Sequence, residues 1–153
     1  MKLARKFALG LIILLLAGGG WAVHKMSMAS SLFEAAYAGK TDEVEKLLKR
    51  GANIEAQDPV YKATPLIYAA QQGYTETVKL LLDKGANIEA RTNLGQTALI
   101  QAALDGHADT VKLLIDRGAI LEDKDRATTL TAVLGNPDIV KMLEATPETP
   151  KGK

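Results

Sequence analysis

The apolar residues of this chain recur at intervals that predict pairs of short helices. Val78, Leu81 and Leu82 follow an i, i+3, i+4 spacing, which places their side chains on one face of a helix. Upstream, Thr64 followed by Pro65 is typical of a helix start, with a capping side chain and a proline at the first helical position. Gly85 stands where a left-handed residue would end the second helix. The pattern therefore predicts two consecutive helices between residues 64 and 84.

The same arrangement recurs along most of the chain. Residues 51–56 read GANIEA, residues 85–90 repeat that segment, and residues 118–123 carry a weaker copy. The first two glycines lie 34 positions apart, and the third lies 33 positions further on. Self-similarity at such a period indicates a stacked array, because one unit alone cannot bury its apolar face.

Longer motifs identify the type of repeat. Residues 64–73 (TPLIYAAQQG) align with residues 97–106 (TALIQAALDG), and a TVKLL segment follows each of them. These motifs resemble the ankyrin repeat, whose pattern runs T-P-L-H-x-A-A, then G, then V-x-L-L-L, then G-A-N or G-A-D. The resemblance covers residues 30–145. It implies an all-α repeat solenoid of about four units, each with two antiparallel helices and an extended β-turn finger.

The sequence departs from this pattern at a few positions. Ile67 and Ile100 stand where the family has histidine, so the buried polar links of that histidine should be missing or replaced. The turn over residues 57–63 has one extra residue, which predicts a longer finger. Lys46 and Glu144 in the end units replace aliphatic residues of the middle units. Such polar changes suit units that cap a stack.

Residues 1–29 have a different character. Three basic residues within residues 1–6 precede an unbroken apolar run over residues 7–23, and no acidic residue occurs before Glu34. This pattern predicts an N-terminal apolar helix that is either an export signal or a single transmembrane anchor. Cleavage before Ser30 or Val23 would make it a signal peptide. The length of the run favours an uncleaved anchor, because the apolar part of a signal peptide usually has about 7–15 residues.

Both alternatives predict the same topology. Basic residues cluster before the apolar run and only Lys25 follows it closely, so the positive-inside bias leaves the N-terminus in the cytoplasm and exports the repeats. We expect a periplasmic array, tethered to the inner membrane through residues 7–23 or soluble after cleavage. Residues 146–153 are polar and proline-rich, and we expect a disordered tail there.

Charge and composition argue against several classes of function. Residues 30–153 carry 15 basic and 18 acidic residues, which does not favour nucleic-acid binding. The chain has no cysteine, and of its two histidines His24 lies at the edge of the apolar run and only His107 lies in the repeats, so we expect neither a metal site nor a cofactor. His107 occupies the position of Tyr74 and Asn136 in other units, which favours a structural role. We therefore expect that the protein is not an enzyme.

The ankyrin resemblance implies that a protein partner binds the finger tips and the exposed positions of each first helix. Carried over by position, the candidate residues are Tyr37, Gln71, Gln72, Leu104 and Asp105 on the helices, Gln57, Val60, Tyr61 and Lys62 in one finger, and Arg91, Asn93, Leu94 and Gln96 in the next. Tyr61 and Leu94 either anchor a partner or pack between neighbouring fingers.

These observations favour an exported scaffold that binds a protein partner through its concave face and turn tips. A narrower version is an accessory or immunity-type protein that restrains a periplasmic enzyme. A self-associating structural protein is an alternative, although we expect a monomer. An enzyme would need a catalytic constellation that the sequence does not offer.

Overall fold

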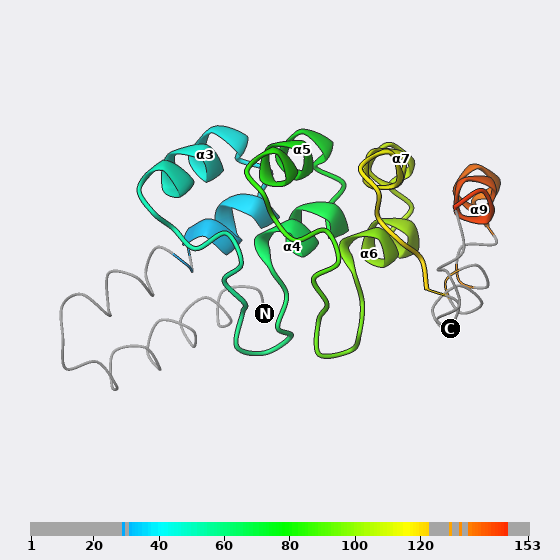
Figure 1. Cartoon of the computed structure of the whole chain (residues 1–153), viewed down its shortest axis with the longest axis horizontal. Helices are drawn as coiled ribbons and strands as arrows, with labels where there is room; N and C mark the ends of the chain where they lie inside the picture. The colour runs from blue at the N-terminus through cyan, green and yellow to red at the C-terminus, as the bar shows by residue number, and fades with distance from the viewer. Residues whose placement is uncertain (1–28, 30, 123–128, 130–131, 133–134, 147–153) are drawn as a thin grey trace, which may run out of the picture.

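The regular structure of the chain is helical throughout the residues that the computed structural model describes, namely 29, 31–122, 129, 132 and 135–146 (Figure 1). The helices are α3 (Thr41–Lys49), α4 (Pro65–Gln71), α5 (Thr75–Asp83), α6 (Ala98–Leu104), α7 (Ala108–Asp116) and α9 (Pro137–Glu144). Residues 31–37 are helical as well. The prediction of an all-helical repeat array is confirmed.

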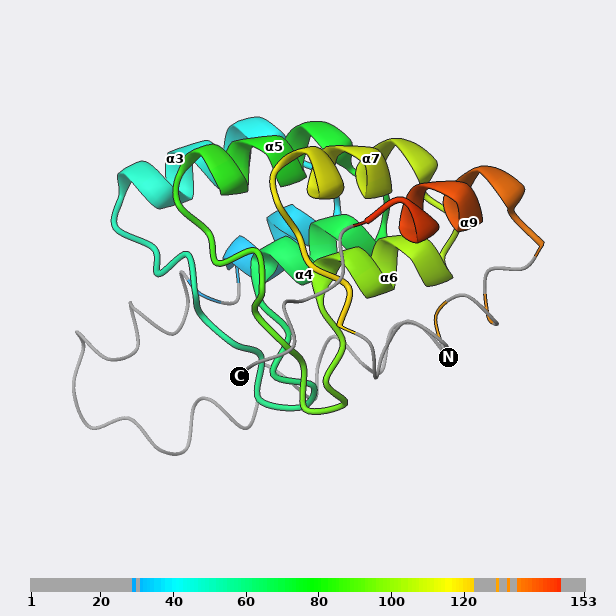
Figure 2. The ribbon, with the colours of Figure 1, turned by 45° about the vertical axis from the view of Figure 1, so that its right-hand side comes forward.

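The helices lie in two rows (Figure 2). Residues 31–37, α4 and α6 form an inner row, and α3, α5, α7 and α9 form an outer row. Helix α4 contacts α5 of its own unit and α6 of the next unit. Two fingers, residues 57–62 and 91–96, project from the side of the inner row, and each leads into the next inner helix.

The predicted signals at the helix ends are confirmed. Thr64 caps α4, since its Oγ1 accepts a hydrogen bond from the N–H of Ile67 at 3.4 Å, and Pro65 is the first helical residue. Thr97 caps α6 in the same manner. Gly85, just after α5, has a φ of 88°, a conformation in which most side chains are strained.

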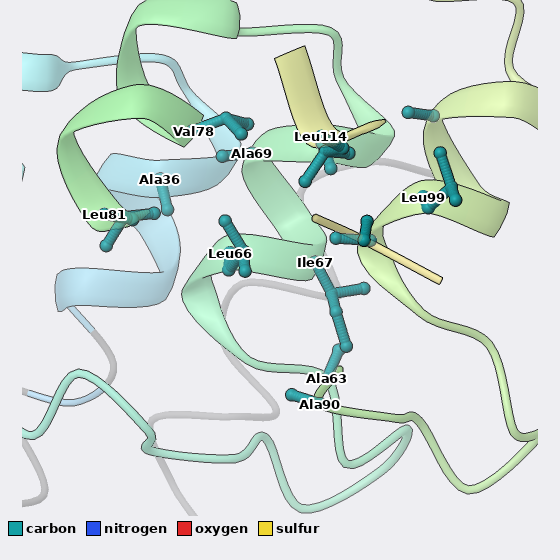
Figure 3. Packing of buried hydrophobic residues seen from close by; sticks show 14 of the residues in the cluster. Ala36, Ala63, Leu66, Ile67, Ala69, Val78, Leu81, Ala90, Leu99 and Leu114 are labelled. Atoms are coloured by element: carbon teal, nitrogen blue, oxygen red, sulfur yellow. The ribbon is translucent and has the colours of Figure 1, made fainter. Parts of the chain in front are cut away.

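The core lies between the two rows. The alanine pairs 69–70 and 102–103 on the inner helices are buried, so neighbouring backbones approach closely. Leu81 and Leu114 project into the same core from the outer helices and are inaccessible to solvent (Figure 3). Of the three residues that the spacing places on one face of this helix, Val78 and Leu81 are fully buried and Leu82 is partly buried.

Polar contacts between successive units recur at equivalent positions. Ile67 and Ile100 are buried where the family has histidine, so other groups make these links. Threonine hydroxyls pair between outer helices, and glutamates of the GANIEA segments accept hydrogen bonds from the next turn. These contacts are Thr41–Thr77 (2.8 Å), Thr75–Thr110 (2.9 Å), Glu55 with the N–H of Asn87 (2.7 Å) and Glu89 with the N–H of Ile120 (2.9 Å).

The end units are polar where the sequence predicts it. Lys46 and Glu144 are exposed. In α9 the buried pair is Ile139 and Leu143, while Val140 is only partly buried although the repeat pattern places it in the core stripe. Ile139 occupies the position that Thr77 and Thr110 have in the middle units. An apolar side chain therefore stands in α9 where the earlier units have one threonine of a hydrogen-bonded pair.

The two segments that flank the predicted array are largely outside the described residues. This applies to the apolar segment over residues 7–23, which we expected to be helical, and to most of the predicted tail. Thr146, the first residue of that tail, is described, and it is buried at the end of α9 with its Oγ1 donating to the carbonyl of Met142. Within the described part of the chain, no helix is both long and apolar enough for a membrane span.

Candidate partner-binding surface

The first finger, residues 57–62, is built around the carboxylate of Asp58. This side chain is only 6% exposed. Its Oδ1 accepts hydrogen bonds from the N–H groups of Val60 and Tyr61, both at 2.8 Å, and its Oδ2 accepts one from the N–H of Ala63 at 2.7 Å. Hydrogen bonds to a carboxylate are strengthened by its charge, so Asp58 holds the loop in one shape.

The second finger, residues 91–96, is organised by a neutral side chain instead. The hydroxyl of Thr92 accepts hydrogen bonds from the N–H groups of Leu94 and Gln96, both at 3.2 Å. The N–H of Thr92 also donates to the carbonyl of Gln96 at 3.0 Å. Thr92 therefore makes fewer and longer hydrogen bonds within its finger than Asp58 makes within the first.

The extra residue predicted in the first finger is present and changes its turn. The N–H of Asp58 bonds the carbonyl of Ala63, five positions on, whereas the equivalent bond of Thr92 spans four. Lys62 takes up the additional length in a left-handed conformation with a φ of 58°. The prediction of a longer turn is confirmed, because residues 57–63 occupy the place that residues 91–96 occupy in the next unit.

Asn93 joins the two fingers. Its backbone N–H donates to the carbonyl of Tyr61 at 2.8 Å, and its Nδ2 donates to the carbonyl of Val60 at 2.9 Å. With the Asp58 bonds, all four backbone polar groups of Val60 and Tyr61 have partners within the chain. The two loops therefore form one structural element.

An aromatic cluster, consisting of Phe33, Tyr37, Tyr61 and Tyr68, lies beside this element. The ring centroid of Tyr68 on α4 is 6.1 Å from that of Phe33 and 6.0 Å from that of Tyr37. Burial raises the pKa of Tyr68 to about 12, and both the charge of Asp58 and the hydrogen bond between the phenol and that carboxylate act in the same direction. Tyr61 and Tyr37 also raise this pKa, so the phenols share one neighbourhood.

The cluster presents two half-exposed rings to solvent. Tyr37 is 52% exposed and Tyr61 is 51% exposed, while Phe33 and Tyr68 are partly buried. The sequence prediction missed Phe33 and Tyr68. The repeat pattern could have indicated Tyr68, because this residue is the variable position x of T-P-L-H-x-A-A, in the helix that follows the first finger. In the following unit the same position is Gln101, whose Nε2 donates to Oε1 of Gln96 at 2.6 Å.

The remaining predicted residues divide into exposed and structural groups. Most are exposed, namely Gln57, Val60, Lys62, Asn93, Leu94, Leu104 and Asp105, while Gln71, Gln72, Arg91 and Gln96 are partly buried. Arg91 forms an ion pair with Glu122 at 2.8 Å and donates to the carbonyl of Gly95, so it braces the second finger. Leu94 is 72% exposed, so the alternative that it packs between neighbouring fingers is wrong.

His107 takes part in the packing between units. Its ring covers Gly73 so closely that a Cβ there would lie 2.5 Å from the imidazole. Its Nε2 is 2.9 Å from the carbonyl oxygen of Gln71. Tyr74 covers Gly39 in the same way one unit earlier. This geometry supports the structural interpretation of His107.

Comparison with known protein families agrees with the repeat geometry. A family model described as ankyrin repeats, in three copies, matches residues 3–92, 32–125 and 89–148. These ranges include both fingers and all the helices described above. A search of curated proteins found no match.

Proposed function

The chain belongs to the ankyrin repeat family, and on this premise we propose that it is a scaffold whose aromatic cluster binds a protein partner. Ankyrin repeats generally mediate protein–protein interaction and are typically not enzymes. The observation that carries the proposal is the pair of half-exposed rings, Tyr37 and Tyr61, of which Tyr37 packs edge-on against Tyr68.

The physical basis is the concentration of apolar surface in a rigid frame. Aromatic side chains in a pocket that excludes water contribute most of the binding energy in typical interfaces. The Asp58 and Asn93 hydrogen bonds already hold the finger that carries Tyr61, so binding loses little conformational entropy there. Gln71 and Gln72 follow Tyr68 by one helical turn, and such polar side chains can form a rim that adjusts to the partner.

We further propose that the array is exported and tethered through residues 7–23. The support is the sequence pattern, with basic residues before the apolar run and the repeats after it. A partner would then be a periplasmic protein or a periplasmic part of a membrane protein. Restraint of a periplasmic enzyme is one activity that such a scaffold could have.

Site-specific photocrosslinking in cells tests the binding surface. A photoreactive amino acid at position 37 or 61 should form one discrete crosslinked product, whereas the same amino acid at position 112 on α7 should not. The double variant Tyr37→Ala, Tyr61→Ala lacks both rings. When purified, it should no longer capture the protein identified in the crosslinked product. Charge reversal at Lys79 and Lys112, both exposed on the outer helices, is the matched control. Capture that depends on the two lysines and not on the rings would place the interface on the outer row and refute the proposal.

A further inference from the structure

We propose that the joined fingers contact the surface of a lipid bilayer, with Val60 and Leu94 inserted at its interface. This inference rests on the proposed N-terminal tether and adds a second membrane contact to it. The contact concerns the finger tips, whereas the aromatic cluster is left for the protein partner.

The first observation is the exposure of two aliphatic side chains at one place. Leu94 is 72% exposed and Val60 is 60% exposed, the largest values for bulky apolar residues in the described part of the chain. They belong to different units, but the bond from Nδ2 of Asn93 to the carbonyl of Val60 holds their loops together at 2.9 Å. Apolar side chains grouped in this way mark an interaction site.

The second observation concerns the backbone of the tip. Insertion into an apolar environment is costly for N–H and C=O groups that lack partners. At Val60 and Tyr61 both N–H groups donate to Asp58 and both carbonyls accept from Asn93. This part of the tip can therefore leave water without losing backbone hydrogen bonds, and the N–H of Leu94 is bonded as well, to the hydroxyl of Thr92.

The third observation is the charge of the fingers. Residues 57–62 and 91–96 contain two basic side chains, Lys62 and Arg91, and a single acidic one, Asp58. Asp58 is 6% exposed and points into its own loop, so the fingers present no accessible acidic group. Lys62 is exposed and follows the tip directly, where it can approach anionic lipid headgroups.

The fourth observation is the position of the tether. Helices α4 and α6 each start directly after a finger, and residues 31–37 occupy the equivalent place in the first unit. The contacts of Tyr68 with both Phe33 and Tyr37 fit this parallel arrangement. The chain therefore enters the array at its finger side. Seven residues, 24–30, separate this point from the apolar run, and they span at most about 25 Å.

The tether also makes a small contact sufficient. Two aliphatic side chains bury too little area to hold a free protein on a membrane. When the array is already attached, insertion becomes an intramolecular event with a high effective concentration, so weak tip binding can dominate the orientation.

Depth measurements on the full chain test this inference. Because the chain has no cysteine, single cysteines at positions 60, 94 and 112 can carry an environment-sensitive fluorophore. Each labelled chain is reconstituted into vesicles of phosphatidylethanolamine and phosphatidylglycerol. Quenching by spin-labelled lipid is then compared with quenching by iodide present on both sides.

The expected result is strong lipid quenching at positions 60 and 94, several-fold above that at position 112. Iodide should show the reverse order. Leu94→Asp should reduce lipid quenching at position 60 while leaving the melting temperature unchanged, because Leu94 is mostly in water. Vesicles of phosphatidylcholine alone should give weaker quenching, since they lack anionic headgroups for Lys62.

Two outcomes would overturn the inference, and they are distinguishable. If the labelled chain fails to float with the vesicles, the tether itself is refuted and the tip contact with it. If the chain floats but iodide reaches positions 60 and 94 as readily as position 112, only the tip contact is refuted. The finger tips would then be available to a protein partner.

Discussion

At the scale of single residues, Tyr68 shows how folding changes the chemistry of a side chain. The phenol is partly buried on α4, between Phe33 and Tyr37, and is bonded to the Asp58 carboxylate. Burial disfavours the charged phenolate most, and ionisation would also place a second negative charge beside Asp58, so the pKa of Tyr68 rises to about 12.

A near-ultraviolet absorbance titration checks this assignment. The native protein should show one phenol that ionises near pH 12, and Tyr68→Phe should remove that step. The pKa of the phenol is higher in the folded state than its ordinary value of 10.0. Its contribution to stability is therefore complete below pH 10 and is lost as the pH rises through about 12. The free energy of unfolding should fall more steeply over that interval in the native sequence than in Tyr68→Phe. Equal slopes would contradict the bond to Asp58.

At the scale of elements, the two fingers offer a matched comparison. Asp58 accepts three backbone hydrogen bonds of 2.7–2.8 Å, whereas Thr92 accepts two of 3.2 Å. Asp58→Ala should lower the free energy of unfolding by roughly 2–3 kcal/mol, because charge-assisted bonds are lost and buried amides lose their partner. Thr92→Ala should cost about 1 kcal/mol. Urea denaturation measures both, and equal losses would show that the carboxylate does not organise the first finger.

The outer helices supply a second test of packing. Leu81 on α5 is inaccessible to solvent, so Leu81→Ala should cost roughly 2–5 kcal/mol from lost burial and the remaining cavity. Leu94→Ala is the same truncation at a site that is 72% exposed, and it should change stability by less than about 0.5 kcal/mol. Similar melting temperatures for the two variants would mean that the wrong face of α5 had been assigned to the core.

At the scale of the whole molecule, the proposed export of the array gives a testable prediction. The three basic residues before the apolar run predict export of everything after it. A reporter active only after export, fused after Lys153, should be active. Replacement of Lys2, Arg5 and Lys6 by glutamate should reduce that activity, because it removes the bias that orients the run. If the first fusion is inactive and a cytoplasmic reporter at the same place is active, the predicted topology is wrong. Mass analysis of the mature N-terminus then distinguishes an uncleaved anchor from a cleaved signal peptide.

The sequence alone determined the repeat architecture. The period of the glycines, the caps at Thr64 and Thr97, the stop at Gly85 and the burial of Leu81 all follow from local spacing, and the structure has them as predicted. Local spacing is sufficient because each unit repeats the same short-range pattern, and stacking only brings equivalent positions together.

The tertiary structure decided how the candidate surface is built. Asn93 donates a hydrogen bond to the carbonyl of Val60, 33 positions earlier in the chain, and Arg91 forms an ion pair with Glu122 of the following unit. Tyr68 joins the rings of Phe33 and Tyr37 to the carboxylate of Asp58. The repeat pattern marks the positions of several of these residues but not the contacts between them. Their contacts arise because stacking brings side chains that are distant in sequence within bonding distance, and this geometry exists only in the folded array.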